Sequence, residues 1–181
     1  MTRAMSLVCG ACAFLSVHEA LGDDAETKAK EAETKIKVAY VYNFPKFVDW
    51  PGDDKNKPAD PIRICVIGTD PIRTMLGELS IRYVEKRPIK VSHVENADAL
   101  SACHLLYVSR SEELLLPLLL QRNQGKPVLT VSDIPQFAQK GGMIGFVTEM
   151  DHVKIEINQG AVHQAGLKVR AKLLEIARIV P

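Results

Sequence analysis

The chain has 181 residues, of which 46% are hydrophobic and 25% are charged, and its formal net charge is +1. A chain of this length and composition can bury the core of one globular domain. A net charge so close to zero excludes proteins that bind nucleic acid or an anionic membrane through an extended basic surface.

The first 22 residues have the composition of a cleaved secretory signal peptide. Arg3 is followed by an almost unbroken run of apolar and small residues at positions 4–17, and Ala20-Leu21-Gly22 resembles a small-x-small cleavage site. The run is shorter than the roughly 20 apolar residues that span a bilayer. We therefore expect an exported protein without membrane insertion after cleavage, and a retained membrane anchor is the alternative.

Removal of this segment leaves two cysteines, Cys65 and Cys103, because Cys9 and Cys12 lie within it. An isolated pair in an oxidising compartment favours a disulfide bond. The chain-entropy model rates the loop that this bond would close at roughly 4 kcal/mol of stabilisation. Two separate buried thiols are the alternative.

Residues 23–34 are charged and rich in alanine, and we expect them to form a flexible lead-in to a domain at 35–181. An aromatic helix is predicted at 36–50, because apolar side chains recur there at helical spacing. Pro45 lies inside this pattern, so the helix should kink or restart near residues 41–43. Most of its aromatic side chains should face the core, but they cannot all point inward from one helix. The side chains that face outward would form a partner surface, and the candidates for it are Tyr40, Phe44, Phe47 and Trp50.

Strands and helices then alternate along the chain. A helix is predicted to begin at Pro71 with Asp70 as its cap, another begins at Glu112, and a short one reaches Ala138. A long C-terminal helix is predicted from residue 159 or 160 to 179, with Gly166 as the place where it would break in two. The predicted strands are residues 62–67, 89–94, 105–108, 128–131, 143–147 and 153–157.

This alternation predicts the α/β class. We expect a single compact domain with a mixed, mostly parallel sheet flanked by helices (Rossmann- or flavodoxin-like), an aromatic N-terminal helix and a long C-terminal helix. The short connection around Asp151 makes the last two strands antiparallel. A bond between Cys65 and Cys103 would place the first and third strands close together, as in the strand order 2-1-3-4.

No catalytic residue, metal site or cofactor is predicted. Ser109 and Ser132 lie outside any G-x-S-x-G motif and are expected to cap helices. The histidines show neither H-x-x-x-H nor H-E-x-x-H spacing.

One weak ligand site is predicted after the first strand. This turn has a single glycine, unlike the G-x-G-x-x-G and P-loop motifs, and Asp70 would repel a phosphate, so a capped turn is the simpler interpretation. The switch-point rule nevertheless places any ligand at the ends of the first and third strands. The residues concerned are Gly68, Thr69, Asp70, Ser109 and Arg110.

Several segments in a fixed order resemble the YfiR family of small bacterial periplasmic proteins, from about residue 35 to 180. They are KVAYVYNFPKFVDWP (37–51), ICVIGTDP (64–71), CHLLYVSRSE (103–112), PVLTVSDIPQFA (127–138), GGMIGFV (141–147), IEIN (155–158) and AGLKVRAKLLEIARIV (165–180).

The resemblance implies a periplasmic, non-enzymatic regulator that represses an inner-membrane diguanylate cyclase by binding its periplasmic sensing domain, which lowers cyclic di-GMP. It also implies a homodimer, an outer-membrane-linked protein that sequesters the regulator, and a disulfide between Cys65 and Cys103. The alternative is a periplasmic small-molecule-binding sensory module that feeds another membrane signalling protein, such as a histidine kinase. An enzyme would require convergent polar residues with perturbed pKa values, and the sequence has no such set.

Overall fold

The computed structural model describes residues 16–52, 60–95 and 102–181. The chain divides into a unit that ends at Ala32 and a unit from Glu33 to Pro181, and the second unit contains the sheet. Among the described residues, no helix combines the length and the apolarity that crossing a bilayer requires.

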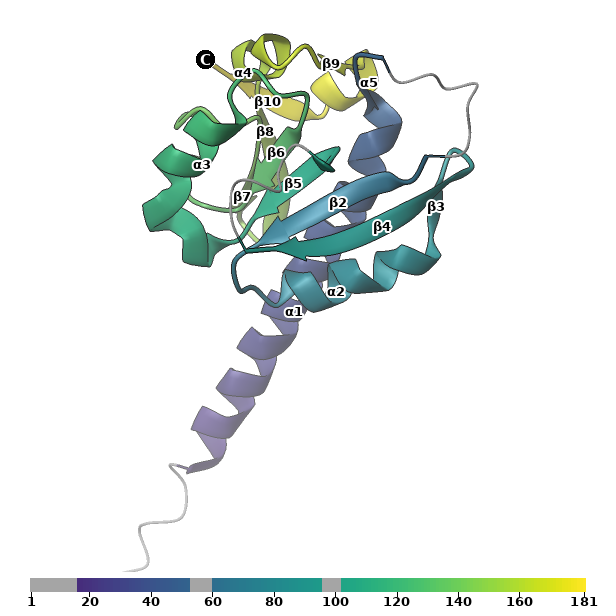
Figure 1. Ribbon diagram of the computed structural model, residues 1–181. Coiled ribbons are helices and arrows are strands. Elements are labelled where there is room, and N and C mark those ends of the chain that lie inside the picture. The colour runs from purple at the N-terminus through teal and green to yellow at the C-terminus, as the bar shows by residue number, and fades with distance from the viewer. Residues whose placement is uncertain (1–15, 53–59, 96–101) are drawn as a thin grey trace, which may run out of the picture. The chain divides into compact units, whose positions relative to one another are not determined.

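One large sheet forms the centre of the second unit (Figure 1). Within the described residues it has eight strands, in the order β10-β8-β7-β6-β5-β2-β4-β3. Strands β4, β2, β5 and β6 are mutually parallel and correspond to the order 2-1-3-4, which confirms the prediction. Strands β7 and β8 are antiparallel, as expected. The bounds are β2 (Ile62–Ile67), β3 (Tyr83–Val84), β4 (Arg87–Val94), β5 (Leu105–Val108), β6 (Leu129–Ser132), β7 (Ile144–Glu149), β8 (His152–Asn158) and β10 (Ala177–Val180).

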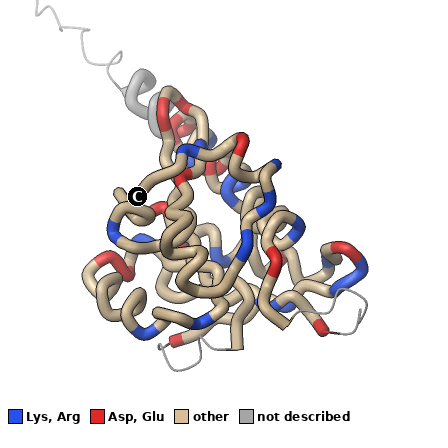
Figure 2. The backbone as a smooth tube through the Cα atoms, turned by 90° about the horizontal axis from the view of Figure 1, so that it is seen from above, with Lys and Arg blue, Asp and Glu red and all other residues tan. Residues whose placement is uncertain are grey.

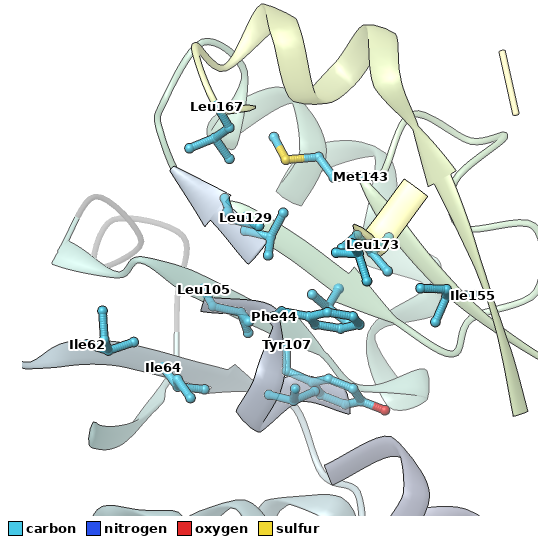
Figure 3. Close-up of a cluster of buried hydrophobic side chains, with 14 of the residues drawn as sticks. Phe44, Ile62, Ile64, Leu105, Tyr107, Leu129, Met143, Ile155, Leu167 and Leu173 are labelled. Carbon is cyan, nitrogen blue, oxygen red and sulfur yellow. The ribbon is translucent and has the colours of Figure 1, made fainter. Parts of the chain in front are cut away.

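The central strands are buried on both faces, which explains why β5 is apolar without polar alternation. The polar residues of β6, Thr130 and Ser132, are also buried, and their hydroxyls form hydrogen bonds to the backbone. Successive side chains of a strand point to opposite faces, so β2 and β5 supply two cores. Ile64, Leu105 and Tyr107 join the core that also contains Phe44 (Figure 3). Leu106 belongs to the second core. The helices that accompany the sheet are α2 (Ile72–Gly77), η1 (Glu78–Ile81), η3 (Arg110–Leu115) and α3 (Leu116–Asn123).

Helix α1 (Ser16–Phe47) includes the predicted aromatic helix. It continues through Pro45, so the predicted restart near residues 41–43 does not occur. Pro45 lies in the last turn of α1, where its missing N–H removes one hydrogen bond close to an end that would fray in any case. The same helix includes residues 23–34, and signal cleavage after residue 22 stays a prediction.

The predicted long C-terminal helix is wrong. The chain instead forms α4 (Gln159–Gln164), β9 (Lys168–Val169), α5 (Ala171–Leu174) and β10. Gly166 has φ +71°, and the N–H of Leu167 donates to Val162 O at 3.1 Å, which closes α4 in the manner of a glycine C-cap. The residues that follow are extended because they pair with distant strands: β9 pairs with β1 (Val48–Asp49), and β10 lies parallel to β8.

A disulfide bond joins Cys65 in β2 to Cys103 just before β5, as predicted, with 5.9 Å between the two Cα atoms. Both residues are buried in the second core. The bond therefore links two strands that are already neighbours in the sheet.

Candidate functional site

The five residues predicted to contact a ligand lie at the carboxyl ends of β2 and β5. Gly68, Thr69 and Asp70 follow β2, and Ser109 and Arg110 follow β5. The N–H of Ser109 donates to Ile67 O at 3.0 Å, so the parallel pairing brings the two turns together.

The protein's own side chains occupy the space above Gly68. This residue has φ +87°, and a Cβ added to it would lie 2.5 Å from Ser111 Oγ. Ser111 Oγ accepts a hydrogen bond from the N–H of Thr69 at 2.9 Å and donates to Glu112 Oε1 at 3.0 Å. A phosphate approaching the glycine would have to displace both side chains.

Asp70 caps α2 as predicted, because its carboxylate accepts from the N–H of Ile72 at 2.9 Å. Burial raises the pKa of Asp70, and the hydrogen bond from Ile72 opposes this only in part. Ser132 Oγ accepts from the N–H of Ile134 at 3.0 Å, but the short helix predicted to reach Ala138 is wrong, because the chain passes through a series of turns at 134–141. The predicted cap at Ser109 is wrong, because within the described residues its buried Oγ has no hydrogen-bond partner. The backbone carbonyl oxygen of Ser109, and not its side chain, accepts the hydrogen bond that closes this turn.

A cluster of ion pairs surrounds Asp133 at the carboxyl end of β6. Lys37 Nζ lies 2.7 Å from Asp133 Oδ2 and 2.6 Å from Glu33 Oε1. Arg110 donates to the Asp133 carbonyl oxygen at 2.8 Å. Burial alone would lower the pKa of Lys37, but the hydrogen bonds to Asp133 and Glu33 outweigh it and raise the pKa. Lys37 in turn lowers the pKa of Glu33 against the effect of burial. The charged groups thus stabilise one another, which is the arrangement of a structural cluster.

Tyr107 is fully buried in β5. Its pKa is raised by burial and by the nearby carboxylates of Asp133 and Asp70. The hydroxyl therefore stays protonated at neutral pH and does not serve as a general base.

A cavity of about 450 Å³ adjoins the ion pairs, and its walls include Lys37, Arg110 and Asp133. Of the five predicted ligand residues, only Arg110 lines it. Within the described ranges, no group of three or more His, Cys, Asp or Glu residues could hold a metal ion. Figure 2 shows acidic and basic positions interspersed along the backbone, without a face of one sign in that view.

The four aromatic residues of the predicted partner surface lie in two places. Phe44 is fully buried, and Tyr40 and Phe47 are half-buried beside it on α1. Trp50 lies at the opposite, amino end of the parallel strands, where its indole N–H donates to His104 O at 3.2 Å. The structure therefore brings three of the four together.

These three residues line an apolar groove between α1 and the segment of α5, which we call the α1–α5 groove. Its volume is about 420 Å³. Ile36 and Ile176 on its walls are 43% and 62% exposed. Exposed apolar side chains gathered at a groove are typical of protein interaction sites. The α1–α5 groove is lined by Ile36, Ala39, Tyr40, Asn43, Phe44, Phe47, Leu173 and Ile176.

Sequence reasoning missed the part of each site that comes from distant segments. Leu173 and Ile176 were assigned to a long helix, which gave no reason to place them beside α1. Lys37 and Asp133 are 96 residues apart, and no local signal connects them. Lys37 is one of several polar residues in the predicted aromatic helix, together with Asn43 and Lys46, so the sequence does not single it out.

Comparison with known proteins gives a family match over most of the chain. A family model described as YfiR/HmsC-like matches residues 34–178. Among solved structures, the ABC domain in complex with L-Trp from Streptococcus pneumonia is 12% identical, with a TM-score of 0.49, over 65% of this chain and 55% of that one. This chain thus spans about half the length of that structure, and so distant a likeness does not bear on function.

Proposed function

Because the chain belongs to the YfiR/HmsC-like family, we propose that it is a periplasmic repressor of an inner-membrane diguanylate cyclase. Family membership supports a non-catalytic periplasmic regulator of diguanylate cyclase at the level of the family. In the finer proposal, the protein binds the periplasmic sensing domain of the cyclase and lowers cyclic di-GMP. The match over residues 34–178 is the observation that carries this proposal.

The mechanism that we propose is a shift of population. A regulator changes the activity of its partner only by binding one conformation of that partner more tightly than another. Here the favoured conformation would be the inactive state of the sensing domain. Homodimerisation, and sequestration by an outer-membrane-linked protein that releases the cyclase, belong to the same proposal.

We assign the cyclase-binding surface to the α1–α5 groove. It combines aromatic walls, the buried Phe44 and the half-buried Phe47, with exposed isoleucines at Ile36 and Ile176. A groove of this composition accepts an apolar side chain from a partner, and such anchors carry most of the binding energy of protein interfaces.

Deletion of the gene tests the proposal, with cyclic di-GMP quantified by mass spectrometry of cell extracts. We expect the level to rise on deletion and to return with the wild-type gene, but not with Ile176→Asp, which places a charge in the groove. Leu114→Asp is the control, because Leu114 is 94% exposed and does not line the groove. Immunoblots of periplasmic fractions verify equal amounts of each variant. An unchanged level on deletion contradicts the proposal.

The cavity beside the ion pairs favours a second candidate, the small-molecule-binding sensory module that feeds another membrane protein. Arg110 and Gln136 both line this cavity, and Gln136 has φ +59°, an uncommon conformation for a residue with a side chain. A periplasmic metabolite that raises the melting temperature of the wild-type protein, but not of Arg110→Gln, would favour this function over the first.

A further inference from the structure

A third cavity lies between the ends of α3 and α4, beside the start of β6. Its volume is about 230 Å³. Its walls come from α3 and the turn that follows it, from β6, from the residues just before β7, and from α4. Among the described residues on these walls none is charged, whereas Lys37, Arg110 and Asp133 line the cavity beside the ion pairs. A ligand of the third cavity would therefore be recognised by hydrogen bonds and apolar contacts rather than by ion pairing.

Asn123 gives the floor of this cavity a hydrogen-bond acceptor. The residue is 3% exposed, and its side-chain Nδ2 donates to Val128 O at 3.2 Å. A carbonyl oxygen can only accept, so this bond fixes which end of the amide is the oxygen. That oxygen, Oδ1, has no hydrogen-bond partner among the described residues. A buried acceptor without a partner is uncommon and costs stability, so a donor supplied by a ligand would be favourable.

The other polar side chains of the cavity can donate as well as accept. Thr130 is buried beside the cavity, and its Oγ1 accepts from the N–H of Met143 at 3.0 Å, so the hydroxyl hydrogen is the part of the group that can donate to a ligand. The rim is exposed and carries three glutamines, whose amide groups each contain a donor and an acceptor. They are Gln121, Gln124 and Gln164.

From this arrangement we propose that the cavity binds one ring of a neutral sugar. Each sugar hydroxyl both donates and accepts, which matches the amides of the rim, and one hydroxyl donates to Asn123 Oδ1. The C–H groups of the ring contact Met143 and Ala165, which are buried and apolar. A carboxylate or an ammonium group would be desolvated there without an opposite charge.

The size of the cavity agrees with a single ring. Sites for drug-sized ligands have volumes of roughly 300–1,000 Å³, and this cavity is smaller. It shares no lining residue with the α1–α5 groove or with the cavity beside the ion pairs. The sugar site therefore does not rest on the proposed regulatory function, and either proposal can fail without the other.

Nuclear magnetic resonance of the purified full chain, titrated separately with D-glucose, D-galactose and D-mannose, tests the proposal. D-galactose and D-mannose each differ from D-glucose in the orientation of one hydroxyl. The backbone N–H signals of Gly125 and Gly141 report occupancy, because both glycines line the cavity. We expect saturable shifts of these signals with at least one of the three sugars.

Charged analogues of the tightest-binding sugar test whether the ligand is neutral. The uronate adds a carboxylate to the same ring, and the amino sugar adds an ammonium group. Both should bind more weakly than the neutral sugar, because the cavity offers no opposite charge among its described residues. Binding of either analogue at least as tight as that of the neutral sugar contradicts the proposed ligand class.

Variants of the walls provide the second measurement. Gln164→Ala should weaken binding about fivefold, the usual effect of losing one neutral hydrogen bond. Asn123→Leu should weaken it at least as much, because it removes the acceptor in the floor. Gln139→Ala is the control, since Gln139 is an exposed glutamine outside the cavity. If Asn123→Leu does not fold, Gln164→Ala carries the test. Equal weakening by Gln139→Ala, or no saturable shift at the cavity with any of the three sugars, overturns the proposal.

Discussion

The carboxyl edge of the sheet and the α1–α5 groove both join distant segments of the chain. They differ in whether their side chains contact one another or remain exposed to solvent. At the edge, Lys37 pairs with Asp133, and Ser111 fills the space above Gly68. At the groove, Ile36 and Ile176 remain exposed to solvent. In an α/β fold the general rule places a ligand at the carboxyl edge. Here much of that edge is used for internal contacts, whereas the α1–α5 groove leaves apolar side chains exposed to solvent.

The largest expected effect on stability comes from the disulfide that links β2 to the residue just before β5. Replacing both cysteines, Cys65→Ala with Cys103→Ala, should lower the free energy of unfolding by about 4 kcal/mol, because the bond closes a loop with a sequence separation of 38. Guanidinium unfolding measures this loss. Reduced wild-type protein is the control and should show a similar loss. An unchanged unfolding midpoint would mean that the sheet does not depend on this bond.

Loss of the buried cation at the carboxyl edge should have the next largest effect. Lys37→Met leaves Asp133 buried without its lysine, and we expect a loss of about 3 kcal/mol in chemical denaturation. Lys30→Met is the matched control, because Lys30 also forms a 2.6 Å pair four residues away, with Glu26, but both side chains are exposed. That control should leave the midpoint unchanged. Equal effects of the two variants would show that the edge is not a structural cluster.

Much of this fold could be predicted because its central elements carry local signals. The apolar run of β5 and the cap at Asp70 identify a strand and a helix start from a few neighbouring residues. The cysteine pair then indicated which strands lie close together, which the disulfide between β2 and β5 confirms.

The C-terminal segment could not be predicted in this way. Helical spacing of its apolar residues is also compatible with short elements, and tertiary pairing decides between them. Strand β10 forms because its backbone pairs with β8, and strand β9 forms because its backbone pairs with β1. The candidate groove depends on the same event, since Leu173 and Ile176 reach α1 only when α5 is short.

A methyl group at Gly68 tests how tightly the carboxyl edge is packed. Gly68→Ala should lower the free energy of unfolding by about 2 kcal/mol more than Gly125→Ala does, because a Cβ there would overlap Ser111 and Glu112. Gly125 is the control: it has a similar positive φ, +71° against +87°, but an added Cβ meets nothing within 4 Å. The difference between the variants thus separates packing from backbone strain. Equal losses would mean that the turn has room for a ligand.

The ion pairs at the carboxyl edge should also make a smaller contribution to the free energy of unfolding, and this contribution should depend on pH. Lys37 lowers the pKa of Glu33 below its unfolded value near 4.5, so the folded state gains stability above that value and loses it as the pH falls through the folded pKa. Thermal unfolding of the wild type should therefore weaken more steeply below pH 4.5 than that of Glu33→Gln. Parallel profiles for the two proteins would contradict a stabilising role of this carboxylate.

The smallest effect on stability is expected at the rim of the α1–α5 groove. Ile176→Ser should change the free energy of unfolding by less than about 0.5 kcal/mol, because most of this side chain is already in contact with water. Leu173→Ala in the same groove should cost about 3 kcal/mol, since Leu173 is only 2% exposed and its removal leaves a cavity. Denaturant unfolding of both variants measures the contrast. A large loss at Ile176 would mean that this side chain supports the fold, and the groove would then resemble the carboxyl edge in serving internal contacts.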